Sequence, residues 1–294
     1  NPLTAVRYYD GNADFPIANS VKVMNPLSQD LGVMRQTLLF GGLESVAHNV
    51  NRKSADLRFY EFGNVYSFDG SKEKTAEKPL AQYSEHAELA LWTTGNLQQP
   101  SWNKTAAESS IFDLKATVLN ILTKSGVAVS ALKMTQGADE TFSVKLDICH
   151  RSGKQLAVLG ILSRKTLKML DIDQEVCYAS VDWDYLCRLA SKYETLFSPI
   201  EKTLPVRRDL ALLLDKATSF ADVETCARKA GGKLLRDVRL FDVYEGKNLP
   251  EGKKSYAVAF TIQDPENTLK DKQIDGVMDK VIKSLQKELG ASLR

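Results

Sequence analysis

Apolar and polar residues alternate over several short stretches in the first two thirds of the chain. Alternation with a period of two predicts half-buried strands. Two stretches with a period near 3.6 predict helices at Gln36–Asn51 and Phe112–Ser125, and a shorter helix fits Arg164–Leu170. The expected strands lie at Ser20–Leu27, Leu57–Phe68, Glu88–Thr94, Ser143–Cys149, Gln155–Ile161 and Cys177–Asp182. Many alternating strands with few helices favour an antiparallel sheet with helices packed on it.

The last ninety residues show a clearer order of elements. We expect a βαββαβ succession, which is typical of a ferredoxin-like domain. Ser219 and Asp222 have the spacing of a helix capping box, and Gly231-Gly232 would end that helix. The expected elements are Leu204–Leu214, helix Phe220–Ala230, Leu234–Tyr244, Lys254–Gln263, helix Asp271–Leu289 and Ala291–Arg294. The last helix carries an apolar stripe that we interpret as core. The fold class is therefore α+β.

Polar and turn-forming residues separate these two regions. We expect a first domain over residues 1–190, a linker over 191–202 that contains Pro199, and a second domain over 203–294. Residues 1–20 have little periodicity and are interpreted as the end of a truncated element, and 70–85 as a loop. The chain has 294 residues, more than one core usually organises, so two domains agree with its length.

The composition narrows the class of protein. Hydrophobic residues make up 43% and charged residues 26% of the chain, as in ordinary soluble proteins. No apolar run approaches the roughly 20 residues of a membrane span. The sequence shows no signal peptide and begins with Asn1, which we interpret as a cut from a longer chain. We expect a cytoplasmic protein.

Cysteine and histidine spacings do not favour a metal site. The four cysteines form no Cys-x-x-Cys pair, and the three histidines lie far apart in sequence. His150 follows Cys149 directly, but on a strand the two side chains would point to opposite faces. We therefore expect no zinc site and interpret the cysteines as reduced buried thiols.

The charge distribution permits an RNA partner without demanding one. The whole chain has a net charge of +2, and residues 201–294 contain 18 Lys and Arg against 15 Asp and Glu. This mild excess is compatible with RNA binding by a shaped surface, but it is not a polybasic arm.

Several ordered strings are more specific than the element order. They are Asn25-Pro26-Leu27-Ser28-Gln29-Asp30-Leu31 with Met34-Arg35, Leu38–Arg52, Phe59-Tyr60-Glu61-Phe62-Gly63, Leu204-Pro205-Val206-Arg207-Arg208-Asp209-Leu210, Phe241-Asp242-Val243-Tyr244-Glu245-Gly246 and Pro250-Glu251-Gly252-Lys253-Lys254-Ser255, followed by Thr268-Leu269 and Arg294. With these strings the chain resembles the C-terminal part of the β subunit of bacterial phenylalanyl-tRNA synthetases, over nearly all residues beyond about 20. It departs from the family pattern at Glu245, where a basic residue is expected, and at Ile161-Leu162-Ser163.

The resemblance implies a class II synthetase-like domain without catalytic residues, followed by a ferredoxin-fold anticodon-binding domain. It implies a phenylalanine–tRNA ligase as the holoenzyme, an α2β2 heterotetramer with a catalytic α subunit, and tRNA(Phe) as the RNA partner. ATP and Mg²⁺ are implied for the holoenzyme, and no cofactor is expected on this chain.

The residues themselves also argue against catalysis in the first domain. Class II synthetases hold the adenylate with an arginine in an Arg-x-Glu pattern, because negative charge accumulates on the α-phosphate. Here Phe59 stands two residues before Glu61, and Arg58 would point to the opposite face of the strand. We therefore expect no catalytic residue and an interface with the α subunit that involves Arg35, Arg52 and Glu61. The alternative is that these three form ordinary surface ion pairs.

The second domain carries the candidate RNA contacts. Proteins read unstacked loop bases by stacking and by hydrogen bonds to base edges, while cations position phosphates. We expect Asp242 to accept from a guanine edge and Tyr244 to be a stacking platform, with Phe241 on the opposite, core side. The remaining candidates are Arg207, Arg208, Asp209, Lys254, Ser255 and Arg294. An internal ion pair is the alternative for the Arg-Arg-Asp trio.

Two other classes of function compete with this interpretation. A ferredoxin-like phosphatase needs a glycine-rich phosphate loop after the first strand, but Lys216-Ala217-Thr218-Ser219 offers one basic residue and no glycine. A free-standing RNA- or protein-binding module without a ligase role remains the alternative.

Overall fold

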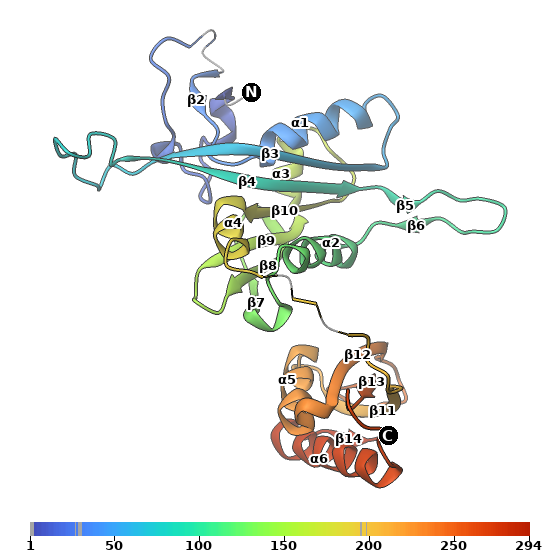
Figure 1. Ribbon diagram of the computed structural model, residues 1–294. Helices are drawn as coiled ribbons and strands as arrows, with labels where there is room; N and C mark the ends of the chain where they lie inside the picture. Colours follow the sequence, from blue (N-terminus) through green and yellow to red (C-terminus); the bar gives the residue numbers. More distant parts are fainter. Residues whose placement is uncertain (1–2, 27, 29–30, 195, 198) are drawn as a thin grey trace. The chain divides into compact units, whose positions relative to one another are not determined.

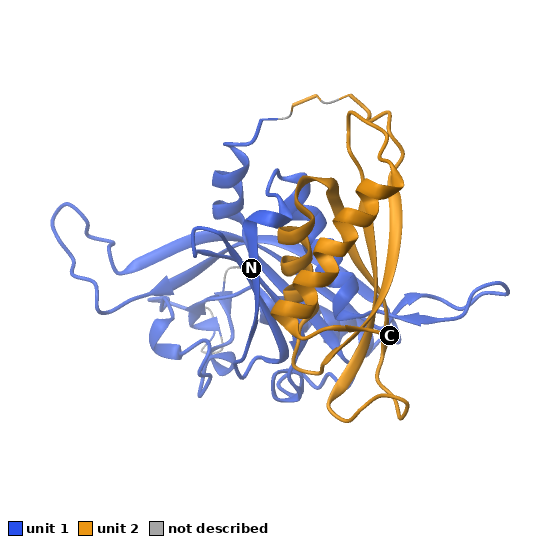
Figure 2. Cartoon of the chain, turned by 90° about the horizontal axis from the view of Figure 1, so that it is seen from below, with its two compact units in different colours: residues 1–195 blue, residues 196–294 orange. Residues whose placement is uncertain are grey.

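A six-stranded antiparallel sheet forms the centre of the first of two compact units, Asn1–Thr195 (Figures 1 and 2). In spatial order its strands are β3 (Leu57–Phe68), β4 (Tyr83–Thr94), β10 (Val176–Asp182), β9 (Gln155–Leu162), β8 (Phe142–His150) and β7 (Leu132–Gly137). The second unit is Leu196–Arg294. This computed structural model describes residues 3–26, 28, 31–194, 196–197 and 199–294.

Each face of the six-stranded sheet has its own hydrophobic core. On one face α1 (Leu39–Val50) packs over Trp92 and Tyr178, and Leu167 of α3 (Arg164–Lys168) joins the same cluster. On the other face α2 (Ile111–Lys124) and α4 (Trp183–Ala190) cover a second cluster, and Figure 1 shows α1 and this pair on opposite sides of the sheet. The predicted antiparallel sheet with helices packed on it is thereby confirmed.

The N-terminal segment is part of the first core, although its sequence has little periodicity. Tyr8 and Tyr9 are both 0% exposed, and the Tyr8 ring stacks on Phe40 of α1 at 4.7 Å. Burial raises the pKa of Tyr9 to about 12, while its hydroxyl accepts a hydrogen bond from the Gln36 backbone N–H at 3.0 Å. These contacts are tertiary, so alternation along the chain could not reveal them.

The predicted strand at Ser20–Leu27 is wrong over its described residues. The only pairing there is an isolated bridge between Lys22 and Val33, and Leu27 lies outside the described residues, as do Gln29 and Asp30 of the neighbouring motif. The strands near this segment are instead short, β1 (Leu3–Thr4) and β2 (Val33–Met34), and they pair with each other.

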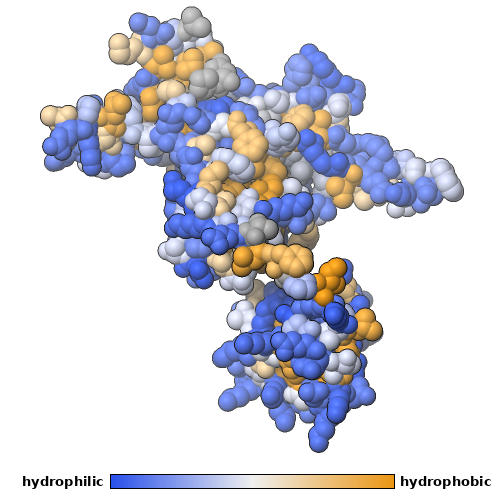
Figure 3. Space-filling model, viewed as in Figure 1, coloured by the Kyte–Doolittle hydropathy of each residue, from blue (hydrophilic) through white to orange (hydrophobic). Residues whose placement is uncertain are grey.

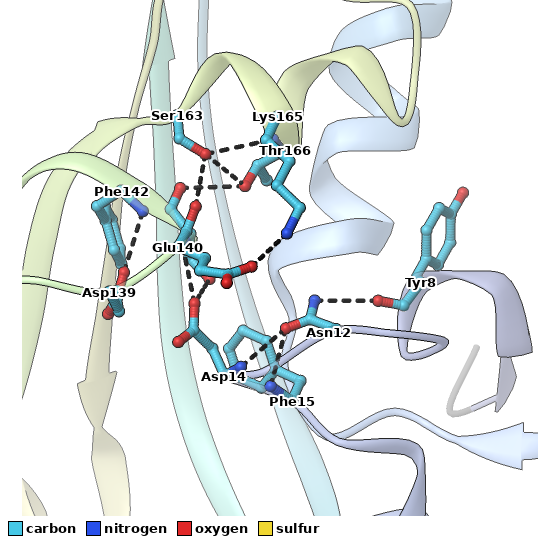
Figure 4. A network of polar contacts seen from close by, with 11 residues as sticks. Tyr8, Asn12, Asp14, Phe15, Asp139, Glu140, Phe142, Ser163, Lys165 and Thr166 are labelled. Atoms are coloured by element: carbon cyan, nitrogen blue, oxygen red, sulfur yellow. Dashed lines mark hydrogen bonds and ion pairs between the residues drawn. The ribbon is translucent and has the colours of Figure 1, made fainter.

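A polar network fastens the N-terminal segment to the end of the sheet (Figure 4). The Thr141 backbone N–H and hydroxyl both donate to Asp14 Oδ2, at 2.8 and 2.6 Å. The Ser163 hydroxyl donates to the Glu140 carbonyl at 2.6 Å, and Lys165 forms an ion pair with the Glu140 carboxylate. These contacts join Asp14 of the N-terminal segment to Thr141 at the start of β8, which gives the network a structural role.

A hairpin arm leaves the sheet after β4 and consists of β5 (Asn96–Gln98) and β6 (Ala107–Glu108). Its root is fixed because Asp56 accepts from the Asn96 backbone N–H at 2.5 Å and Arg58 donates to the carbonyl of Leu97. Trp102 on the arm is 96% exposed. The sequence pattern did not reveal this arm, β7 or α4, because each is short or directly continues another element.

The second unit has the predicted βαββαβ order and is confirmed as ferredoxin-like. Its sheet order is β12-β13-β11-β14, and every neighbouring pair is antiparallel. The elements are β11 (Val206–Asp215), α5 (Phe220–Gly231), β12 (Leu235–Tyr244), β13 (Lys253–Ile262), α6 (Asp271–Leu289) and β14 (Ser292–Leu293). The stripe of α6 is core, since Ile274, Val281 and Leu285 are at most 2% exposed.

The first turn of α5 is closed by a capping box. The Ser219 hydroxyl accepts from the Asp222 backbone N–H at 3.2 Å, and Asp222 accepts from the Ser219 backbone N–H at 3.1 Å. We expect Ser219→Ala to destabilise the second unit by about 1 kcal/mol, because the helix then begins with unsatisfied N–H groups. Urea titrations followed by far-UV circular dichroism would measure this loss, and an unchanged midpoint would contradict it.

The polar character of the surface agrees with the ordinary hydrophobic and charged fractions of the sequence. The face of the molecule in Figure 3 is predominantly hydrophilic, with hydrophobic side chains gathered in small patches. Among the described residues, none of the helices combines the length and the hydropathy needed to span a bilayer.

Candidate nucleic-acid interface

The second unit has one sheet face that its helices do not cover. Tyr256, Val258, Phe260 and Ile262 of β13 point to the α5 and α6 side and form the core. Side chains alternate along a strand, so Ser255, Ala257, Ala259 and Thr261 face the other way. We call this second side the open face. Residues paired with these four positions lie on the open face too, because cross-strand partners share a face.

Asp242 and Tyr244 lie together on the open face, as the sequence predicted. Asp242 pairs with Ala257 and Tyr244 pairs with Ser255 in the β12–β13 ladder. Asp242 is exposed and Tyr244 is 37% exposed, whereas Ser255 beneath Tyr244 is only 6% exposed. A carboxylate is thus presented to solvent two residues from an accessible aromatic ring.

Arg294 reaches the same site from the far edge of the sheet. Its backbone N–H donates to the Ala211 carbonyl at 3.0 Å, next to β14. Its guanidinium carbon lies 5.3 Å from the centre of the Tyr244 ring. This distance is within the range of a cation–π interaction. The structure therefore brings Arg294 to Tyr244 although fifty positions separate them in the sequence.

Arg207 and Asp209 form a second charged group on the open face. The Arg207 Nε and Nη2 atoms donate to the two oxygens of Asp209 at 2.8 and 3.1 Å. These bonds raise the pKa of the Arg207 guanidinium above its ordinary value. The internal ion pair that the sequence left as an alternative is therefore present, and it orients Arg207.

Phe241 lies beside this ion pair and not in the core. The Arg207 guanidinium carbon is 5.2 Å from the centre of the Phe241 ring, and Phe241 is 49% exposed. The expectation of a core position for Phe241 is wrong because the pairing of β12 with β13 is shifted between Leu240 and Asp242. A bulge of this kind adds an unpaired residue and breaks the alternation of faces.

Two further candidates lie on the helix side of the sheet. Arg208 pairs with Phe260, and its Nη2 lies 4.0 Å from the Asp271 carboxylate at the start of α6. Lys254 is 7% exposed, and its ammonium lies 4.6 Å from the centre of the Tyr256 ring. The structure does not bring Arg208 and Lys254 together with Asp242 and Tyr244.

In the first unit, Arg35 and Glu61 meet and Arg52 does not join them. Arg35 Nη1 donates to Glu61 Oε1 at 2.8 Å, and its Nε donates to the Asn64 carbonyl at 2.9 Å. Gly63 makes room for this arginine, because a Cβ there would lie 2.2 Å from Arg35 Nη2. Arg52 instead contacts His48 at the end of α1.

Arg58 and Glu61 point to opposite faces of β3, as expected. Arg58 donates to the carbonyls of Asn96 and Leu97 in the hairpin arm, whereas Glu61 binds Arg35. No group of three or more His, Cys, Asp or Glu side chains within the described part of the chain could hold a metal ion.

Comparison with known proteins follows the same division of the chain. A family model described as the phenylalanyl tRNA synthetase beta chain CLM domain matches residues 2–183. The chain belongs to this family. A second family model, described as a ferredoxin-fold anticodon binding domain, matches residues 202–294 of the same chain.

Two similar curated relatives carry the same name. The chain is similar to the phenylalanine–tRNA ligase beta subunit of Bacteroides fragilis, with 49% identity over 100% of this chain and 36% of the relative. It is also similar to the beta subunit of Porphyromonas gingivalis, with 44% identity over 100% of this chain and 36% of the relative. The chain thus spans about a third of the length of these relatives.

Among solved structures, the chain is similar to a pyrrolysyl-tRNA synthetase from Desulfitobacterium hafniense. The TM-score is 0.47 at 10% identity, over 66% of this chain and 62% of the other.

One exposed aromatic residue of this beta chain's open face, Phe241, was not predicted by the strand pattern. Phe241 stands next to Asp242 in the sequence, and strict alternation therefore assigned it to the core. The signal that could have corrected this is the odd spacing of the apolar positions in Val238, Leu240 and Val243, which changes phase within one strand. Glu245, the departure from the family pattern, lies 3.8 Å from Lys216 in an ion pair.

Proposed function

We propose that this chain is part of the β subunit of a phenylalanine–tRNA ligase and that its second unit binds the anticodon region of tRNA(Phe). The observation that carries the proposal is the open face, where Asp242, Tyr244 and Arg294 converge in the unit matched by the anticodon-binding model. The names of the relatives support the same reading of the whole protein.

The candidate residues on the open face have distinct roles in this proposal. Tyr244 stacks on an unpaired loop base, and the Asp242 carboxylate accepts hydrogen bonds from the edge of a guanine. Arg294 and Arg207 supply positive charge for phosphates or base edges, with Asp209 orienting Arg207. Ser255 lies beneath Tyr244 and is only 6% exposed, so it is not assigned an RNA contact. Arg208 and Lys254 are left out of the RNA surface because they lie on the helix side.

The first unit supports the reaction without performing it. The arginine nearest to Glu61 on β3 is committed to the hairpin arm, so this strand presents no arginine beside the carboxylate for an adenylate. In this proposal a catalytic α subunit binds ATP and Mg²⁺ and charges the tRNA in the cytoplasm as part of an α2β2 assembly. The first unit contributes to assembly of the subunits. Its Arg35 links the segment after β2 to Glu61 of β3, and Arg52 is exposed at the end of α1.

Binding of the 294-residue chain to a tRNA(Phe) anticodon stem-loop tests the proposal. We expect Tyr244→Ala to weaken binding about 10-fold or more, because stacking of a base on an aromatic ring is worth about 1–3 kcal/mol. Asp242→Ala should weaken binding to the native loop and reduce the preference for guanine. Fluorescence anisotropy over a salt series would measure both effects.

Lys287→Ala on α6 is the matched control, since it removes a charge from the helix-covered side. It should leave the preference between native and altered anticodons unchanged. Equal affinity of the wild-type chain for native and altered loops would show nonspecific electrostatics only and would contradict the proposal.

A further inference from the structure

The open face holds two arginine–aromatic pairs, not one. Arg294 lies over Tyr244 at 5.3 Å, and Arg207 lies over Phe241 at 5.2 Å. Both aromatic rings come from β12, whereas the two arginines come from the other side of β13. Each pair therefore crosses the central strand of the sheet.

Small side chains of β13 form the floor between the two pairs. Ser255, which pairs with Tyr244, is 6% exposed, and Ala259, which pairs with Asp209 of β11, is 5% exposed. Ala257 lies between them, is half-buried, and pairs with Asp242. Of these three floor residues, Ala257 in the middle is thus the most accessible.

Arg207 is prepared for a planar ligand by its contacts. Arg207 donates from Nε and Nη2 to the two oxygens of Asp209, and its Nη1 donates no hydrogen bond within the described part of the chain. The guanidinium side chain is still 59% exposed. An arginine held in this way can stack on a base and donate to a base edge or phosphate without first losing conformational freedom.

Phe241 is an exposed aromatic residue without any polar group. Hydrogen bonding to water therefore does not explain why its ring is exposed. The bulge between Leu240 and Asp242 brings Phe241 to the open face. Burial of the same ring in the core would have been favourable. Strands rise about 3.3 Å per residue, so Phe241 and Tyr244 lie within about 10 Å of each other along β12.

We propose that Phe241, held against Arg207, is a second stacking position that takes the loop base next to the one on Tyr244. The inference rests on the proposed anticodon binding and extends it from one base to two. In this inference Phe241 contacts the RNA directly. Arg207 packs on the Phe241 ring and donates hydrogen bonds to the second nucleotide.

The test pairs protein variants with RNA loops that each lack one base. Binding of the 294-residue chain is measured for the wild type, Phe241→Ala and Tyr244→Ala, against stem-loops with an abasic site at each loop position in turn. We expect Phe241→Ala to weaken binding to the intact loop about 5- to 20-fold. Its effect should vanish for one abasic loop, and the effect of Tyr244→Ala should vanish for a neighbouring one.

Val243→Ala is the matched control, because Val243 is 48% exposed but pairs with Tyr256 on the helix side. It should bind every loop as the wild type does. Phe241→Trp should retain the coupling to the same abasic position, since stacking needs only a flat ring.

The failures of the two proposals can be told apart. If Tyr244→Ala couples to a base and Phe241→Ala binds like the wild type, the second position is refuted and anticodon binding stands. Coupling of both variants to the same base would also refute it, because one base would then lie between the two rings. If neither variant couples to any base, anticodon reading by this face is refuted and the inference falls with it.

Discussion

Gly42→Ala is expected to destabilise the first unit by about 3 kcal/mol or more, at the upper end of the cost of overpacking a core. A Cβ at Gly42 would lie 2.1 Å from Trp92 Cε2, and the Trp92 ring is only 1% exposed. The indole cannot move into solvent, so α1 would have to shift from the sheet. Urea denaturation followed by tryptophan fluorescence should show a markedly lower midpoint.

The neighbouring glycine gives the control. A Cβ at Gly41 would meet no atom within 4 Å, and Gly41 is exposed in the same helix. Gly41→Ala should therefore stabilise the unit by about 0.5–1 kcal/mol, because alanine loses less backbone entropy in a helix. If both substitutions moved the midpoint in the same direction, the close packing of α1 on Trp92 would be wrong.

Phe260→Ala is expected to destabilise the second unit by about 3–5 kcal/mol, the usual cost of removing a buried phenylalanine. Phe260 is 0% exposed and lies on the central strand β13 against the core formed with α5 and α6. Phe241→Ala on the same sheet is the control, because a half-exposed ring leaves no closed cavity. Its stability should change by less than about 1 kcal/mol.

The three tryptophans allow the two units to be followed separately. Trp92, Trp102 and Trp183 all belong to the first unit. Phe260→Ala should therefore shift part of the transition seen by far-UV circular dichroism and leave the tryptophan transition in place. An equal shift of both signals would show that the units unfold as one.

Local patterns predicted most of the fold, because period and capping are properties of short segments. The strand Leu57–Phe68 and the helix Asp271–Leu289 have the bounds that the sequence predicted. Features that depend on long-range contacts were not predicted. Tyr8 and Tyr9, for example, are buried by partners more than twenty-five residues away. The hairpin arm escaped because β5 and β6 are only three and two residues long.

The candidate site was predictable to the extent that strand alternation holds. Alternation placed Asp242 with Tyr244 and Arg207 with Asp209 correctly. It also implies that Lys254 and Ser255 point to opposite sides, and the structure has only Ser255 on the open face. Alternation failed at Phe241, because a bulge is a property of the pairing between two strands and is not written in either strand alone.

The same bulge bears on how this surface can change in evolution. Loss of one residue from a paired strand normally turns every later side chain to the other face. Phe241 is the unpaired residue of the bulge, so deleting its codon would leave Asp242 opposite Ala257 and Tyr244 opposite Ser255. A lineage can therefore gain or lose the second aromatic ring through a single in-frame insertion or deletion, while the rest of the surface keeps its register.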